Sequence, residues 1–209
     1  MEKDPQNPMV TLTPGELHPR EAYRLLVSIV VPRPIAWVST LGADGSHNLA
    51  PFSFFNVVGG TPPTVMVSVG QRAGRPKDTL RNVQETGEFV VHLANEALAA
   101  RLNLTSGEWP YDADEFDIAG LARVPSTDVT PSRLLEAPVA MECRSTQIVP
   151  VEDTTYTMIL GRVLRYHIRE GLIGENGLVQ ALQLGAIARL GGDEYTAIDR
   201  TFSLSRPQV

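Results

Sequence analysis

The chain has 209 residues, of which 43% are hydrophobic and 20% charged, as is usual for a soluble globular protein of one domain. Its formal net charge is −6 and it has no basic run, which argues against a nucleic-acid partner. No stretch approaches the ~18 consecutive apolar residues of a membrane span, and the polar N-terminus has no apolar signal core. We therefore expect a cytoplasmic protein with no membrane partner.

Residues 1–18 read as an extended N-terminal arm, and residues 19–209 as a single domain. Within the arm, residues 9–12 are apolar enough to add a short edge strand. A helix is predicted to begin at Pro19 and to end before Pro32. Its apolar stripe has the spacing of one helix face and consists of Tyr23, Leu26, Val27 and Val30.

Residues 33–56 are the most informative stretch. An apolar, β-prone run at residues 35–41 precedes Asp44-Gly45, a dipeptide that suits a tight hairpin, and a second strand follows. Because Pro51 has no backbone N–H, this second strand must bulge, bend or lie at an edge there. A bent strand would leave backbone N–H and C=O groups free to bind a flat polar ligand. An ordinary kinked hairpin remains the alternative.

The rest of the domain alternates short strands with short helices. Strands are predicted at residues 64–69, 88–93, 118–124, 139–149 and 155–169, helices at 77–86, 96–102 and 177–183, and loops at 104–117 and 127–137. Gly161 would mark a bend or bulge in the longest strand, and the loop at 104–117 would form a surface loop or lid. Strands at this spacing suggest a closed or partly closed antiparallel barrel.

Most motifs of catalytic or cofactor sites are missing. The chain has no G-x-G-x-x-G after a strand, no P-loop, no C-x-x-C and no G-x-S-x-G. The four histidines are scattered, so no metal site is predicted. Cys143 lies in the middle of the strand predicted at 139–149, and we expect it to be a buried, unreactive thiol.

The tripeptide Lys77-Asp78-Thr79 opens a predicted helix. The first turn of a helix has unpaired N–H groups at the positive end of its dipole, and Lys77 and Thr79 add a cation and a hydroxyl. These groups would suit one phosphate. Capping of the helix by Asp78 explains the same residues equally well.

Five segments in this order resemble the flavin reductase-like family of FMN-binding split-barrel proteins. They are Arg33-Pro-Ile-Ala-Trp-Val-Ser-Thr40, Asn48-Leu-Ala-Pro-Phe-Ser-Phe-Phe-Asn56, Pro62-Pro63, Lys77-Asp-Thr79 with Asn82, and Gly87-Glu-Phe-Val-Val91. The tail Arg189-Leu-Gly-Gly-Asp-Glu-Tyr195 fits as well, so the resemblance covers residues 20–207.

The resemblance implies a mainly β fold, namely a six-stranded antiparallel Greek-key split barrel with a few short peripheral helices. It implies a homodimer with FMN near the interface. It also implies a flavin reductase that transfers hydride from NADH or NADPH to flavin N5, with a monooxygenase as a possible recipient of the reduced flavin. No catalytic side chain is expected, since the flavin carries the chemistry.

Two other flavin-linked functions remain open: a flavodoxin-like electron carrier, and an FMN-binding protein without nicotinamide activity. A pyridoxamine-phosphate oxidase is disfavoured, because its motifs are not seen.

The resemblance also assigns cofactor-binding residues by motif. The segment Asn48, Leu49, Ala50, Pro51, Phe52 and Ser53 would line the isoalloxazine ring. Ser39, Thr40 and Ser53 would contact the ribityl-phosphate side, and Lys77 and Thr79 would hold the phosphate. Trp37 and Tyr195 are candidate walls of the groove. Arg72 and Arg75, in the loop before the helix, could read a 2′-phosphate of NADPH, although such loop arginines are usually just solvated.

Overall fold

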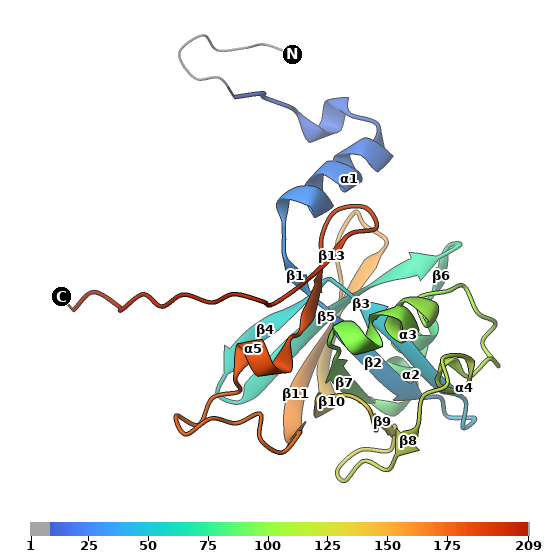
Figure 1. Ribbon diagram of the computed structural model, residues 1–209. Helices are drawn as coiled ribbons and strands as arrows, with labels where there is room; N and C mark the ends of the chain where they lie inside the picture. The colour runs from blue at the N-terminus through green and yellow to red at the C-terminus, as the bar shows by residue number, and fades with distance from the viewer. Residues whose placement is uncertain (1–8, 209) are drawn as a thin grey trace.

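The computed structural model describes residues 9–208 and consists mainly of β-strands with a few short helices (Figure 1). Within these residues the largest sheet is antiparallel, with the order β3-β2-β7-β10-β11-β5-β4 and with β6 paired to β5. Its strands are β2 (Ala36–Leu41), β3 (His47–Phe52), β4 (Phe55–Gly60), β5 (Pro63–Arg72), β6 (Arg75–Pro76), β7 (Glu88–Leu93), β10 (Val139–Pro150) and β11 (Tyr156–Ile168). The pairs β2–β7 and β5–β11 join distant parts of the chain, as Greek-key connections do. The prediction of a mainly β antiparallel barrel is confirmed.

The predicted number of six strands is too low. The six predicted strands correspond to β2, β3, β5, β7, β10 and β11, and the structure adds β4 and β6. The second predicted strand ran on to Phe55, whereas β3 ends at Phe52 and the chain bends at Ser53 and Phe54 before β4. Because β3 and β4 are the two terminal strands of the sheet, the sheet is open between them.

Strand β3 lies at an edge, which is one of the outcomes predicted from Pro51. Within the described part of the chain it pairs only with β2, and it stays in register through Pro51, which lies opposite Trp37. The N–H of Leu49 points away from β2 and donates to Glu115 Oε2 at 3.0 Å. Position 51 has the same orientation in the pleat, so its proline removes an outward donor from the edge. The bend in the chain comes two residues later.

Helices lie around the sheet rather than across it. They are η1 (Pro14–Glu16), α1 (Pro19–Ile29), α2 (Asp78–Thr86), η2 (Glu96–Leu98), α3 (Ala99–Leu104), α4 (Glu115–Ile118) and α5 (Ala181–Leu184). Gly87 follows α2 in the left-handed region, at φ 73°, so the helix ends at residue 86 as predicted. In the described part of the chain, none of the helices is long and apolar enough to cross a membrane.

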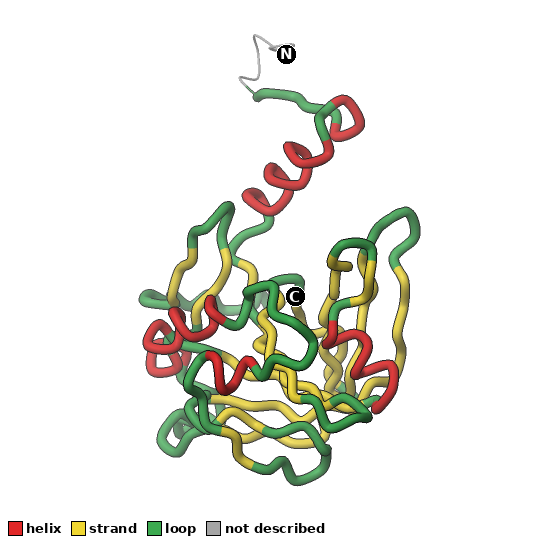
Figure 2. Tube along the Cα trace, turned by 90° about the vertical axis from the view of Figure 1, so that its right-hand side faces the viewer, coloured by secondary structure: helices red, strands yellow, loops and turns green. Residues whose placement is uncertain are grey.

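Helix α1 stands off from the sheet in two perpendicular views (Figures 1 and 2). The helix itself was predicted, but of its apolar stripe only Val27 is buried. Leu26 and Val30 are each more than half exposed. The stripe therefore does not pack on the barrel of its own chain.

Several short elements differ from the predictions. Residues 9–12 hold only an isolated bridge at Val10, and the strand predicted at 118–124 is reduced to β8 (Arg123–Val124). The predicted loop at 127–137 contains β9 (Arg133–Leu134), which pairs with β8. The helix predicted at 177–183 is the single turn α5. A small sheet of β1 (Arg33–Pro34), β12 (Ile187–Arg189) and β13 (Tyr195–Ala197) was not predicted.

Strand β2 is buried on both faces and separates two apolar clusters. Ala36 and Val38 face the barrel interior, whereas Trp37 faces a second cluster formed with α3 and α4. Gly161 lies inside the barrel wall, where an added Cβ would come within 2.2 Å of the Phe89 ring. The pairing of β10 with β11 shifts register next to it, but the extra residue, Thr146, lies on β10, so the irregularity is in the partner strand and not at Gly161 itself.

Two buried titratable groups have structural roles. Cys143 is fully buried, and burial raises the pKa of its thiol to about 12, as expected for an unreactive cysteine. His92 is also fully buried, and its Nε2 accepts from Leu134 N at 3.0 Å, so Nδ1 carries the proton toward Trp37 O at 2.9 Å. Burial lowers the pKa of His92 to about 4, which keeps this bridge neutral.

Candidate functional site

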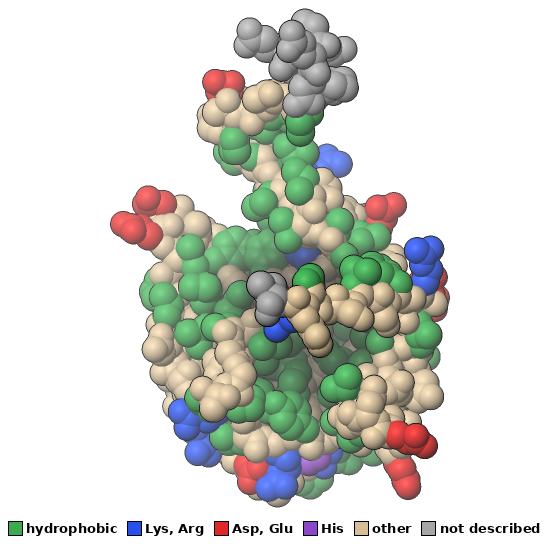
Figure 3. Space-filling model, turned by 90° about the vertical axis from the view of Figure 1, so that its left-hand side faces the viewer, with side chains coloured by type: hydrophobic (Ala, Val, Ile, Leu, Met, Phe, Trp, Pro, Cys, Tyr) green, Lys and Arg blue, Asp and Glu red, His purple; other side chains and the backbone are tan. Residues whose placement is uncertain are grey.

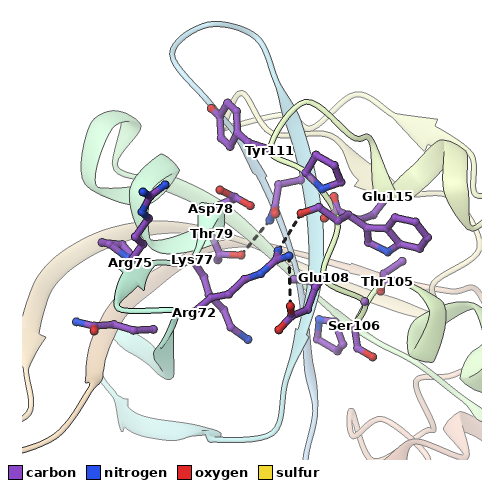
Figure 4. Close-up of a pocket in the computed structure, with 18 of the residues that line it drawn as sticks. Arg72, Arg75, Lys77, Asp78, Thr79, Thr105, Ser106, Glu108, Tyr111 and Glu115 are labelled. Atoms are coloured by element: carbon purple, nitrogen blue, oxygen red, sulfur yellow. Dashed lines mark hydrogen bonds and ion pairs between the residues drawn. The ribbon is translucent and has the colours of Figure 1, made fainter.

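A cavity of about 740 Å³ lies between β3, the β5–β6 hairpin, the start of α2 and the chain from Thr105 to Tyr111 (Figure 4). We call it the first cavity. Pockets of roughly 300–1,000 Å³ are typical for drug-sized ligands and cofactors. Three basic residues, Arg72, Arg75 and Lys77, line it together with three acidic ones, Asp78, Glu108 and Glu115.

The start of α2 opens into this cavity. Lys77 occupies the N-cap position in an extended conformation, and no side chain of the described residues caps the helix. Asp78 is the first helical residue rather than the cap, so the alternative of capping by Asp78 is wrong. The first-turn N–H groups of α2 therefore keep their capacity to bind an anion.

Lys77 adds a positive charge beside that helix start. Its Nζ lies 5.5 Å from the centroid of the Phe52 ring. Desolvation, followed by the positive charge of Arg72, lowers the pKa of Lys77. A cation in such a position gains the most from an anionic ligand, because the ligand offsets both effects.

A buried hydrogen-bond network fixes α2 against the sheet. Asn48 Nδ2 donates to Thr79 Oγ1 at 2.9 Å and to Thr40 Oγ1 at 3.3 Å. Asn82 Nδ2 donates to the same Thr40 oxygen at 3.0 Å. All four side chains are less than one-tenth exposed. The network thus sets the position of the helix start relative to β3.

The loop predicted at 104–117 forms one wall of the first cavity. Arg72 of β5 reaches across, donates to Trp109 O at 2.8 Å and lies 3.6 Å from Glu108 (Figure 4). Tyr111 Oη donates to Asn82 Oδ1 at 3.3 Å, and the guanidinium of Arg81 lies over the Tyr111 ring. The loop is therefore tied to β5 and α2 on opposite sides of the cavity.

Glu115 is a cavity residue that the sequence patterns did not single out. It is 7% exposed, and its Oε2 accepts from the outward N–H of Leu49. Burial, with smaller contributions from Asp78 and Asp114, raises the pKa of its carboxyl group to about 7. The acidic and aromatic composition of residues 104–117 was the only signal that pointed to it.

A second cavity of about 350 Å³ adjoins the first, and the two share Pro51 and Ser106. Its lining comes from α1, from the small sheet and from the bend after β3. We call it the second cavity. We call the two adjoining cavities together the groove, and Pro51 of the edge strand β3 borders both of them.

The structure brings seven of the twelve predicted cofactor residues to this groove. Asn48, Ala50, Pro51, Lys77 and Thr79 line the first cavity, and Ser53 and Tyr195 line the second, as does Pro51. The other five, Trp37, Ser39, Thr40, Leu49 and Phe52, line neither and are buried.

Two of these five, Trp37 and Ser39, form hydrogen bonds outside the groove. Trp37 Nε1 donates to Thr105 Oγ1 at 2.9 Å and so supports the cavity wall from inside. Ser39 Oγ donates to Ser132 O at 2.6 Å, away from the groove.

The model of the flavin reductase like domain family matches residues 28–183. The chain belongs to this family. The flavin reductase-like chain is 39% identical over 203 residues to an uncharacterized protein of Halalkalibacterium halodurans, covering 95% of this chain and 97% of that one.

Solved structures resemble this flavin reductase-like protein along nearly its whole length. Nitrilotriacetate monooxygenase component B from Bacillus cereus is 37% identical with a TM-score of 0.91, covering 95% of this chain and all of that one. Pseudomonas fluorescens 2-nitrobenzoate 2-nitroreductase NbaA is 31% identical with a TM-score of 0.86, covering 95% and 96%. A protein with a split barrel domain from Shewanella frigidimarina, 18% identical over 93% and 96% with a TM-score of 0.84, shares the fold. The family and the split-barrel fold predicted from the motifs are confirmed.

Proposed function

We propose that this protein is an FMN-binding oxidoreductase, and that it acts as an NAD(P)H-dependent flavin reductase. The observation that carries the proposal is the uncapped start of α2, which opens with Lys77 into a cavity of cofactor size. Membership in the flavin reductase-like family supports it. FMN ends in one phosphate, and this helix start provides the N–H groups and the cation that a phosphate requires.

The chain's own residues would bind and orient the flavin. Lys77, Thr79 and the first N–H groups of α2 would hold the phosphate, and Asn48 and Ala50 would border the ribityl chain and ring along β3. When bound, the flavin supplies a hydride acceptor at N5. No side chain is then required as nucleophile or general base.

Ser53 would act at the electron-rich edge of the ring. It lies in the bend after β3, and within residues 9–208 its backbone N–H donates no hydrogen bond to another residue. An N–H fixed at such a bend stabilises negative charge that develops beside it. Since Ser53 lines the second cavity and Pro51 borders both cavities, we assign this backbone group to the pyrimidine end of a flavin that would extend from the first cavity past Pro51.

A partner monooxygenase would consume the reduced flavin. The support is the similarity to nitrilotriacetate monooxygenase component B, at 37% identity. The second candidate is electron transfer without nicotinamide oxidation. It requires only a flavin site, which the first cavity would provide, and no site for a nicotinamide.

A homodimer forms part of the proposal. The exposed apolar residues of α1 and β4 include Leu26, Ile29, Val30, Val57 and Val58, each at least half exposed. Figure 3 shows one hollowed face below α1 where hydrophobic side chains gather. A second copy of the chain would cover this surface, since monomeric proteins rarely expose contiguous apolar patches of large area.

The test of FMN binding compares two charge-removing variants. Lys77→Ala should weaken FMN binding about 10- to 100-fold, the effect of losing one charge-assisted hydrogen bond. Arg162→Ala, which removes an exposed cation on β11, should leave FMN affinity unchanged. Quenching of FMN fluorescence during titration measures both. Equal affinities of the two variants would contradict the phosphate assignment.

Rapid mixing separates the reductase from the electron carrier. FMN-loaded protein is mixed with NADH or with NADPH, and the loss of flavin absorbance is followed. A reductase should bleach at roughly 1 s⁻¹ or faster with at least one of them, as enzyme turnover requires. Much slower bleaching with both would favour the electron carrier.

A further inference from the structure

The second cavity carries an unbalanced positive charge. Three arginines, Arg24, Arg33 and Arg189, line it, and among the described residues no Asp or Glu does. The first cavity has as many acidic as basic residues, and the chain as a whole carries a net charge of −6. The clustering of three guanidinium groups in this cavity therefore contrasts with the net negative charge of the chain.

Arg33 is the most deeply buried of the three, with 7% of its surface exposed. Its guanidinium donates to Val27 O, Val30 O and Leu190 O, and its Nε is buried without a partner within the described residues. Across residues 9–208, no carboxylate lies within ion-pair distance of it. A buried charge without a counter-charge is costly, and a bound anion would offset that cost.

Arg189 presents a second guanidinium in a fixed orientation. Its Cζ lies 4.4 Å from the centroid of the Tyr195 ring, and it donates to Tyr195 Oη and Gly192 O. Asp193, 3.5 Å away, is fully exposed, so this ion pair is screened and weak. Stacking on the ring leaves the arginine charged and held in place.

The remaining walls of the second cavity are apolar and partly flat. Ile35, Pro51 and Leu102 line it together with the rings of Tyr23 and Tyr195. Its volume of about 350 Å³ lies near the lower limit for ligand pockets, which suits one ring rather than a dinucleotide.

We propose that the second cavity binds a small planar ring that bears a carboxylate. The carboxylate would pair with the guanidiniums of Arg189 and Arg24 and neutralise the field of Arg33, because guanidinium groups match carboxylates with two parallel hydrogen bonds. The ring would lie between the tyrosines.

The shared residues of the two cavities give this ligand a place next to the cofactor. Pro51 and Ser106 border both, so a ring in the second cavity would lie beside the flavin proposed for the first. Its role as a reaction partner of the flavin rests on the proposed function, whereas its binding does not.

Calorimetric titration of the purified full chain tests the site with benzoate as the probe. Benzamide, which has the same shape without the charge, and inorganic phosphate, which has charge without the ring, are the comparison ligands. Benzoate should bind with a Kd below about 1 mM, and benzamide at least about tenfold more weakly. Equal binding of benzoate and benzamide, no benzoate binding at 10 mM (about ten times that Kd), or phosphate binding as tight as benzoate would overturn the proposal.

Two variants locate the binding. Arg189→Gln should weaken benzoate binding at least about tenfold, and Arg24→Gln, on the exposed side of α1, should weaken it in the same direction. Arg162→Gln, on the surface of β11, should change nothing. Circular dichroism confirms that each variant is folded. Unchanged benzoate affinity in both cavity variants overturns the assignment.

FMN titrations of the same samples separate this site from the proposed function. Benzoate binding without FMN binding would contradict the flavin proposal and leave the carboxylate site supported. FMN binding without benzoate binding would contradict the carboxylate site and leave the flavin proposal supported.

Discussion

At Glu115 the fold holds a carboxyl group against the edge of a strand and away from water. Burial raises its pKa from an ordinary value of 4.5 to about 7, so the folded state keeps a proton that the unfolded state has already released. The stability that this neutral group contributes is fully present below about pH 4.5 and is lost as the pH rises through 7. The loss amounts to up to about 3 kcal/mol at about 1.4 kcal/mol per pKa unit.

Glu115→Gln should remove that pH dependence, because the amide oxygen still accepts from Leu49 N but never ionises. We expect the variant to match the wild type near pH 5 and to exceed its stability at pH 8. Urea unfolding of the FMN-free protein at the two pH values measures the difference. Glu85→Gln, an exposed change on α2, should show no such trend. If the variant gains no more stability over the wild type at pH 8 than at pH 5, the Glu115 carboxyl group does not have the raised pKa.

Among the strands, β11 depends on one glycine for its fit against β7. An added Cβ at Gly161 would lie 2.2 Å and 2.7 Å from two carbons of the Phe89 ring, inside a well-packed barrel. Gly161→Ala should therefore destabilise the protein by about 1–3 kcal/mol, the usual cost of overpacking a core. Gly60→Ala in β4, where a Cβ would meet no atom within 4 Å, should change stability by less than about 0.5 kcal/mol.

Unfolding by guanidinium chloride measures the stability of both glycine variants. Similar midpoints for Gly161→Ala and Gly60→Ala would mean that the Phe89 ring moves aside at little cost.

For the whole molecule, the exposed apolar face of α1 and β4 has a consequence for assembly. Light scattering should give the mass of two chains of 22.8 kDa each at micromolar concentration. Ile29→Glu places a charge at a position that is 67% exposed in a single chain, and it should shift the mass toward the monomer. Leu135→Glu, at a residue that is 60% exposed in a loop after β9, should not. A wild-type monomer would contradict the homodimer proposal.

The longer elements were predictable because their signals are local. The apolar run of β7, the helix stop at Gly87 and the hairpin at Gly45 each lie within a few residues of what they determine. The small sheet of β1, β12 and β13 was not predictable, because two- and three-residue strands pair over more than 150 positions. The open point between β3 and β4 likewise depends on a bend that Pro51 only suggested.

The site was predictable as a region rather than residue by residue. A motif marks consecutive positions, whereas a strand points them alternately to opposite faces, so Asn48 and Ala50 line the groove and Leu49 does not. Glu115 gains its raised pKa from burial beside Leu49, which lies 66 positions away in the sequence. No local pattern encodes such contacts.

The burial of Cys143 also makes the native chain convenient for spectroscopy. It is the only cysteine in the sequence, and at neutral pH its thiol is both protonated and shielded from reagents. A maleimide dye or spin label would therefore react only with a second cysteine introduced by design. A label on a cysteine that replaces Ser106, which borders both cavities, would report ligand entry into either one, and Cys143 would not have to be removed.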